Sequence, residues 1–152
     1  MSDSLKQWAR VQRALIRIEN NKNRQEEEYE DDVWFFFQNC YHLKDWIIHD
    51  DTNLISSKTV EAYIERNLEL KLCADLANRS KHLKLTKKPR KDAKTSSKDL
   101  TIDCATAGFP GEGSWHYDFV VSWEDSSMEA IKLAQESVKE WAKLLTTYGV
   151  LN

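Results

Sequence analysis

The sequence predicts an α+β fold, in which four to five helices form a bundle and an antiparallel β-hairpin packs against it. The chain has no glycine before Gly108 and no proline before Pro89, and so long a stretch without helix breakers indicates helices. After residue 98 the apolar residues change from a three-to-four-residue spacing to alternation, which indicates strands. A length of 152 residues is typical of one domain, so we expect residues 1–152 to form a single one.

The first helix is expected over residues 4–21. Ser4 and Gln7 have the spacing of a capping box, in which two groups satisfy free amides of the first turn. Apolar side chains then recur every three or four positions, which places them on one face: Leu5, Trp8, Val11, Leu15 and Ile18. This face should pack into the core.

The second helix is expected over residues 25–49 and should be central. Its first turns are acidic, which suits the positive end of the helix dipole. Apolar residues then cover more than half of its circumference, as in a buried helix. A strand over residues 33–37 is the alternative, because that segment is rich in aromatic strand formers. We prefer the helix because the apolar pattern continues past residue 40 without a turn signal.

Two further helices are expected after a turn at residues 50–53. Ser57 can cap a helix that runs to about Asn67, and the next spans residues 68–84; the two could also form one bent helix. Their inward residues would be Val60, Tyr63, Ile64, Leu72, Leu76, Ala77 and Leu83. The inward positions of Cys40 and Cys73 predict structural thiols.

Residues 86–98 are expected to form a mobile basic loop, because they contain no large apolar side chain. From residue 79 to 98 nine Lys and Arg stand against one Asp. Such a block can contact phosphates, so nucleic acid is a possible partner only through this loop. The whole chain has a net charge of −3 and a pI of about 5.8, which is not typical of a general nucleic-acid binder.

Two strands and a last helix complete the predicted fold. Residues 100–105 and 115–123 alternate, and the glycine-rich link between them favours an antiparallel hairpin. The hairpin's aromatic face, Trp115, Phe119 and Trp123, should be buried against helices, with Phe36, Phe37 and Trp141 as neighbours. Ser126 and Glu129 form another capping box, and Gly149 ends the last helix. Its inward stripe would be Ile131, Ala134, Val138, Trp141, Leu145 and Tyr148.

The three cysteines are too few for a disulfide framework, so we expect free thiols in the cytoplasm. The first twenty residues lack the compact apolar stretch of a secretory signal. The chain also lacks a run of about 18 apolar residues, so no membrane span is expected. No cofactor is expected.

Two polar stripes form the candidate site. His42, Asp45 and His49 are spaced i, i+3, i+7 on the second helix, and Asp75, Asn78 and His82 repeat that spacing on the fourth, with Arg79 adjacent. If the stripes face each other, imidazoles and carboxylates converge, which suits zinc or iron or general acid–base chemistry. Otherwise each stripe is the solvated side of an amphipathic helix. Because the Glu-x-x-His and His-Glu-x-x-His signatures are absent, we assign no metal.

Residues 39–46 and 75–82 together resemble a pattern in small bacterial proteins without assigned activity, often carried by phages or other mobile elements. The resemblance covers roughly residues 33–85. The Asn-Arg-Ser-Lys-His segment is also similar to HEPN-type ribonucleases, whose motif is an Arg followed four to six residues later by His. Here only two residues separate Arg79 from His82, which departs from that motif.

The leading interpretation is a small cytoplasmic protein that works by binding and forms a homodimer, because pairing with a second subunit would satisfy the exposed hairpin edge. The alternative is an enzyme built on the polar stripes, either metal-dependent or a HEPN-like ribonuclease of the toxin type.

Overall fold

The computed structural model describes residues 1–81, 102–105 and 116–152. Among these residues it contains five helices and three strands, which confirms the α+β class and the helical bundle with a hairpin. The elements are α1 (Asp3–Glu19), α2 (Glu26–Ile48), α3 (Ser57–Arg66), α4 (Leu68–Lys81), β1 (Ile102–Ala105), β2 (His116–Trp123), β3 (Ser126–Glu129) and α5 (Ala130–Thr147).

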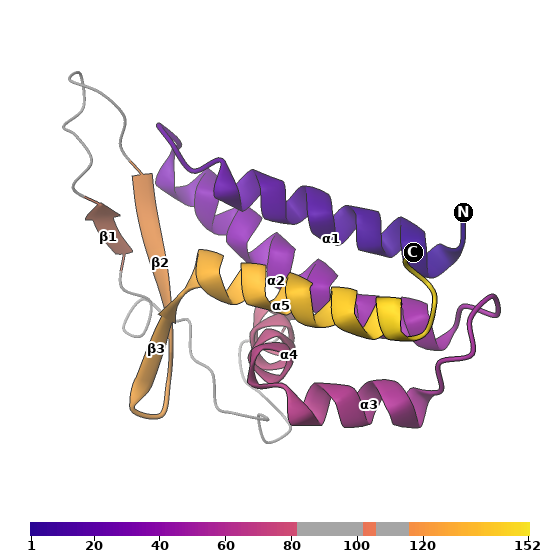
Figure 1. Ribbon diagram of the computed structural model, residues 1–152. Coiled ribbons are helices and arrows are strands. Elements are labelled where there is room, and N and C mark those ends of the chain that lie inside the picture. The colour runs from indigo at the N-terminus through magenta and orange to yellow at the C-terminus, as the bar shows by residue number, and fades with distance from the viewer. Residues whose placement is uncertain (82–101, 106–115) are drawn as a thin grey trace.

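The helices form a bundle with the small sheet at one end (Figure 1). Helices α1 and α2 run antiparallel as neighbours, and α5 packs against both of them. Helix α4 packs across α2 and α5, while α3 lies at the outer side of the bundle (Figure 1). Both chain termini lie at the end of the bundle opposite the sheet.

One hydrophobic cluster joins all five helices to β2. Its largest fully buried side chains include Trp141, Tyr29, Phe36, Phe37 and Phe119. Phe119 is 2 % exposed and Trp123 is 8 % exposed, which confirms that this strand face is buried with Phe36, Phe37 and Trp141 in the same core. Trp115 lies outside the described residues.

The N-cap of helix α1 lies two residues before Ser4, the cap that the sequence suggested. Ser2 is the N-cap, and its Oγ accepts a hydrogen bond from the Leu5 amide at 3.3 Å. Ser4 and Gln7 are buried and bond to other elements instead, so the Ser4–Gln7 capping box was wrong. The two residues have the spacing of a cap, but tertiary partners compete for their side chains.

Helix α2 confirms the helical interpretation, and the alternative strand over residues 33–37 was wrong. Its buried residues recur at helical spacing along its length: Tyr29, Val33, Phe36, Phe37, Cys40, Leu43 and Ile47. Burial of this face outweighs the preference of its aromatic residues for strands.

Helices α3 and α4 are separate, so the bent single helix is excluded. Asn67 adopts an extended conformation between them, with φ −116° and ψ 116°. The cap of α3 is Ser56, whose Oγ accepts from the Thr59 amide at 3.1 Å, and not Ser57 as expected. Helix α4 is described as far as Lys81. Leu83 and the loop expected at residues 86–98 lie outside the described residues.

The predicted antiparallel hairpin is present, with Ile102 of β1 opposite Phe119 of β2. The sequence missed β3, which pairs with β2 on the other side and places Trp123 opposite Ser126. The predicted Ser126–Glu129 capping box was therefore wrong: these residues form the strand, and α5 begins at Ala130. Glu124 has φ 48° in the tight turn between β2 and β3.

The inward stripe of α5 is mostly confirmed. Ala134, Trp141 and Leu145 are buried, but Tyr148 is 47 % exposed and lies outside the core. Gly149 ends the helix as predicted, with φ 71°. Its amide bonds to the Thr146 carbonyl at 3.0 Å and the Val150 amide to the Leu145 carbonyl at 2.8 Å, the pattern of a Schellman cap. Tyr148 is exposed because it is the C-cap residue, where the chain leaves the helix.

Candidate functional site

The α2 stripe turns toward the start of α1. His42 is partly buried, whereas Asp45 and His49 are exposed. Asp45 and His49 line a hollow of about 200 Å³ together with Asp3 and Trp46. Asp3 belongs to the first turn of α1. The structure therefore places two of the stripe's three residues, Asp45 and His49, at the C-terminal end of α2, beside the first turn of α1.

The α4 stripe is more buried. Asp75 is 2 % exposed, and Asn78 and Arg79 are partly buried. His82 lies outside the described residues. Helices α2 and α4 do meet, because the Gln38 amide donates to the Ser80 hydroxyl at 3.0 Å. Within the described residues, no three His, Cys, Asp or Glu side chains gather in a way that could hold a metal ion.

A second polar group lies inside the bundle, where α2, α4 and α5 meet. Cys40 and Cys73 are buried free thiols, in agreement with their predicted inward positions. The Cys73 sulfur and the Ser137 hydroxyl form a hydrogen bond of 3.0 Å, and Ser137 also donates to the Leu133 carbonyl. Burial raises the pKa of the Cys40 thiol well above its usual range, and the neighbouring Cys73 raises it further. The Cys40 thiol is therefore protonated, and both cysteine side chains serve the packing of the core.

The indole N–H of Trp141 lies beside Cys40 and slightly favours its thiolate. The contact does not reach hydrogen-bond geometry, so this buried N–H has no partner in the described part of the chain. The missing hydrogen bond costs free energy inside the core, because Trp141 is 1 % exposed.

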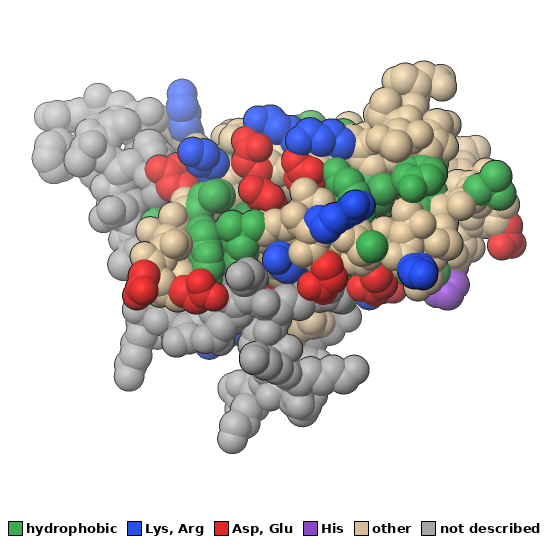
Figure 2. Space-filling model, turned by 60° about the horizontal axis from the view of Figure 1, so that its bottom comes forward, with side chains coloured by type: hydrophobic (Ala, Val, Ile, Leu, Met, Phe, Trp, Pro, Cys, Tyr) green, Lys and Arg blue, Asp and Glu red, His purple; other side chains and the backbone are tan. Residues whose placement is uncertain are grey.

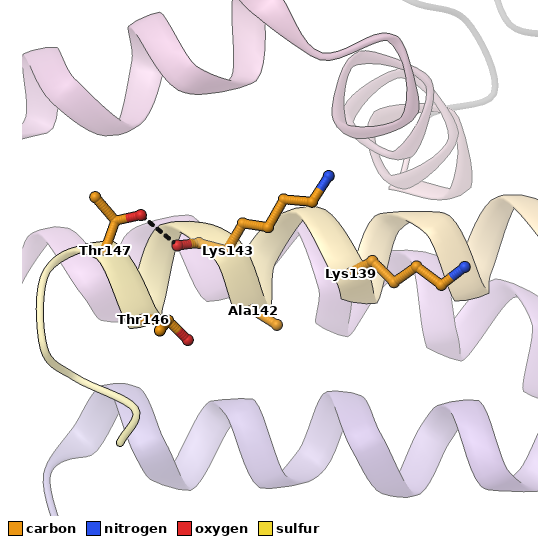
Figure 3. A pocket seen from close by; sticks show the side chains of 5 residues that line it. All are labelled: Lys139, Ala142, Lys143, Thr146 and Thr147. Atoms are coloured by element: carbon orange, nitrogen blue, oxygen red, sulfur yellow. Dashed lines mark hydrogen bonds between the residues drawn. The ribbon is translucent and has the colours of Figure 1, made fainter.

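A broad open pocket lies along the second half of α5 (Figure 3). It has a volume of about 560 Å³ and is lined by Lys139, Ala142, Lys143, Thr146 and Thr147. Both lysines are already paired on their own helix, Lys139 with Glu136 at 2.8 Å and Lys143 with Glu140 at 2.5 Å. The Thr147 hydroxyl donates to the Lys143 carbonyl, so its hydrogen is also used (Figure 3).

Glu140 links this pocket to α3. The Tyr63 hydroxyl donates to a Glu140 carboxylate oxygen at 2.9 Å. Burial and this carboxylate together raise the pKa of Tyr63 to about 12. The contact fixes α3 against α5 and leaves the phenol protonated.

The exposed side of α1 and α2 carries a row of arginines over aromatic rings. Arg10 stacks on Trp46 at 4.9 Å from the ring centroid, Arg17 on Phe35 at 5.6 Å, and Arg24 on Tyr29 at 5.6 Å. Arg10 and Arg17 are seven residues apart on α1, so they lie on one line of that helix, and Arg24 follows at the same spacing in the connection to α2. The seven-residue spacing is visible in the sequence, but the stacking was not among the predicted features.

The same side also exposes large apolar side chains. Phe35 is 41 % exposed and Ile16 is 63 % exposed. We call this surface the α1–α2 face. It is formed by six exposed residues and the residues next to them. The six are Arg10, Arg13, Ile16, Arg17, Asp31 and Phe35. Stacking on the rings holds the guanidinium groups in place.

Away from the α1–α2 face, the charged side chains are distributed differently. On the face shown in Figure 2, acidic and basic side chains are interspersed, and hydrophobic side chains form a broken band between them. Such mixing is ordinary for a solvated surface.

Comparisons with known proteins found no matching family model, no matching curated protein and no matching solved structure. In the described part of the chain, no helix is long and apolar enough to cross a membrane. The function of this chain must therefore be inferred from its own surfaces and buried groups.

Proposed function

We propose that this chain is a protein-interaction module of the cytoplasm, and that its contact surface is the α1–α2 face. The observation that carries the proposal is Phe35, which is 41 % exposed although it belongs to the most aromatic segment of α2. Aromatic residues and arginines are enriched where proteins bind one another. The two free thiols, Cys40 and Cys73, agree with a reducing compartment.

Site-specific photocrosslinking tests this proposal. A benzophenone amino acid is placed at Phe35 in the full chain, and at Tyr148 as the matched control. Both residues are exposed aromatic residues, but Tyr148 ends α5 on another part of the surface. After irradiation of cells that express each variant, position 35 should give a discrete crosslinked protein species and position 148 should not. The proposal is wrong if position 35 yields no adduct, or the same adducts as position 148.

A second candidate function is the enzyme alternative, a HEPN-like ribonuclease of a mobile element, and Asp75 favours it. Asp75 is 2 % exposed, and ionisable groups inside a fold occur at functional sites as well as in structural networks. Arg79 follows one helical turn later on the same line of α4.

Incubation with labelled RNA separates this candidate from the interaction module. If the candidate is correct, the wild-type chain cleaves the RNA and Arg79→Ala loses the activity while keeping its helical circular dichroism spectrum. Intact RNA after incubation with the wild type, both with and without divalent metal, rules the candidate out.

A further inference from the structure

The α1–α2 face has a basic zone and an acidic zone. Because α1 and α2 are antiparallel, Ser4 meets Asp50 at one end, Arg17 meets Phe35 near the middle, and Arg24 meets Asp32 at the other end. The zone beside the first half of α2 is acidic, and the zone along α1 is basic. Phe35 lies between the two zones on α2, where the guanidinium group of Arg17 stacks on its ring, and the exposed Ile16 directly precedes Arg17 on α1.

The basic zone contains Arg10, Arg13 and Arg17, all exposed on α1. The acidic zone contains Glu27, Glu28 and Asp31, all exposed on the first turns of α2. Within this zone Arg24 already forms an ion pair with Asp32, at 2.6 Å. Each zone thus presents a surplus of one sign of charge to solvent.

From this arrangement we infer that the partner of the α1–α2 face is a second copy of this chain. A two-fold axis that lies in the plane of the face, between the two zones and perpendicular to the line that joins them, exchanges the positions of the zones in the second copy. Each basic zone then lies over the partner's acidic zone, and the apolar residues of both copies meet at the centre. A surface with its charges and apolar centre in this order is complementary to itself, as an isologous interface requires.

Charge complementarity favours this occupant over a nucleic acid. A polyanion would contact the basic zone but would be repelled by the acidic zone on the same face. This inference rests on the proposed function, because it names the partner of the same surface.

The area of the face determines how tightly the two copies are expected to associate. A face about 30 Å long and about 20 Å wide, two helices side by side, offers about 600 Å² per copy. This is below the roughly 800 Å² per partner of a standard interface. The dimer should therefore dissociate on dilution, and its association must be followed over a wide range of concentrations.

Sedimentation velocity on the full chain and two charge-reversed variants provides the test. The acidic variant carries Arg13→Glu and Arg17→Glu, and the basic variant carries Glu28→Arg and Asp31→Arg. The wild type should show a concentration-dependent dimer. Each variant alone should bind itself at least tenfold more weakly, because like charges then oppose each other. An equimolar mixture of the two should regain the dimer, because every reversed zone again meets its opposite.

Controls keep the result interpretable. A variant with Lys139→Glu and Lys143→Glu changes the same number of exposed charges on α5 and should dimerise like the wild type. Thermal melting of each variant checks that it is folded. If the folded variants both dimerise like the wild type, or if their mixture stays monomeric, the inference is wrong.

The photocrosslinking experiment distinguishes failure of the dimer inference from failure of the interaction module. A wild-type chain that stays monomeric at all concentrations, while position 35 crosslinks to a different protein, refutes the dimer and leaves the interaction module intact. Absence of any adduct at position 35 refutes the interaction module itself. An adduct of twice the chain mass at position 35 supports both.

Discussion

Ser4 and Asp50, 46 residues apart in the sequence, form a joint between α1 and the turn that follows α2. Asp50 Oδ2 accepts the Ser4 amide at 2.8 Å and the Ser4 hydroxyl at 2.5 Å. Its other oxygen accepts the Thr52 amide at 3.0 Å and the Thr52 hydroxyl at 2.5 Å. A buried carboxylate thus satisfies a free amide in the first turn of α1 and lies at the positive end of that helix.

Replacing Asp50 should destabilise the fold. Asp50→Asn removes the charge and places an amide donor against groups that donate, so one buried donor loses its acceptor. We expect a loss of about 1–3 kcal/mol in the free energy of unfolding. Urea denaturation measures it. The control is Asp51→Asn, an exposed neighbour, which should change the free energy by less than about 0.5 kcal/mol. Equal effects at the two positions would contradict the prediction.

The same carboxylate should make stability depend on pH. Burial raises the pKa of Asp50, but the hydrogen bonds from Ser4 and Thr52 outweigh it and hold the pKa well below its usual range. A carboxyl with a lowered pKa stabilises the folded state fully above its unfolded pKa of about 4, and this contribution disappears as the pH falls toward the folded value.

The difference in unfolding free energy between the wild type and Asp50→Asn should therefore be constant near neutral pH and shrink below about pH 4. Urea titrations at a series of pH values give this difference directly, because the other carboxyl groups are common to both proteins. A difference that stays constant or grows in acid would show that the Asp50 pKa is not lowered.

Helix α2 and the β1–β2 hairpin could be predicted because each depends on a pattern within a short stretch. Burial of one face at helical spacing outweighs the strand preference of Phe35, Phe36 and Phe37. By contrast, the Ser4–Asp50 joint depends on a contact over 46 residues, which no local pattern records. Strand β3 depends on pairing with β2, and its four residues have the spacing of a helix cap.

The candidate site was only partly predictable, since a stripe on a helix does not reveal which neighbour it faces. The spacing of Asp45 and His49 correctly places them on one side of α2, but the hollow they line also contains Asp3 of α1. The burial of Asp75 follows from the central position of α4, where residues on every side are covered. Sequence periodicity alone does not show that a helix is enclosed on all sides.

Truncation of Phe119 should reveal the contribution of the sheet to the core. Phe119 is 2 % exposed, and its ring centroid lies 5.4 Å from that of Tyr29. We expect Phe119→Ala to cost about 3–5 kcal/mol in unfolding free energy, the usual range for a buried aromatic side chain. Val120→Ala, at the next and half-buried position, is the control and should cost clearly less. A cost below about 1 kcal/mol for Phe119→Ala would place this strand face outside the core.

The buried thiols should be protected from alkylation. Reaction with iodoacetamide requires a thiolate, and burial together with Cys73 keeps the pKa of Cys40 high. At about pH 8 the native protein should leave Cys40 and Cys73 unmodified over hours, whereas both should react within minutes in concentrated urea. Peptide mapping by mass spectrometry assigns the modified residues. Rapid native labelling of either cysteine would mean that the α2–α4–α5 core opens readily.

The last prediction asks whether the two polar stripes act together. Asp75 of α4 is 2 % exposed and His42 of α2 is partly buried, on helices that pack against each other. If the stripes share one site, a double-mutant cycle of His42→Ala and Asp75→Asn should show a coupling above about 0.5 kcal/mol in unfolding free energy, whereas independent residues add. The matched cycle pairs Asp75→Asn with Asp45→Asn, because Asp45 is exposed in the hollow beside α1 and should not couple. Additive effects in both cycles would show that the α2 and α4 stripes are separate, and the enzyme alternative would then lose its proposed residues on α2.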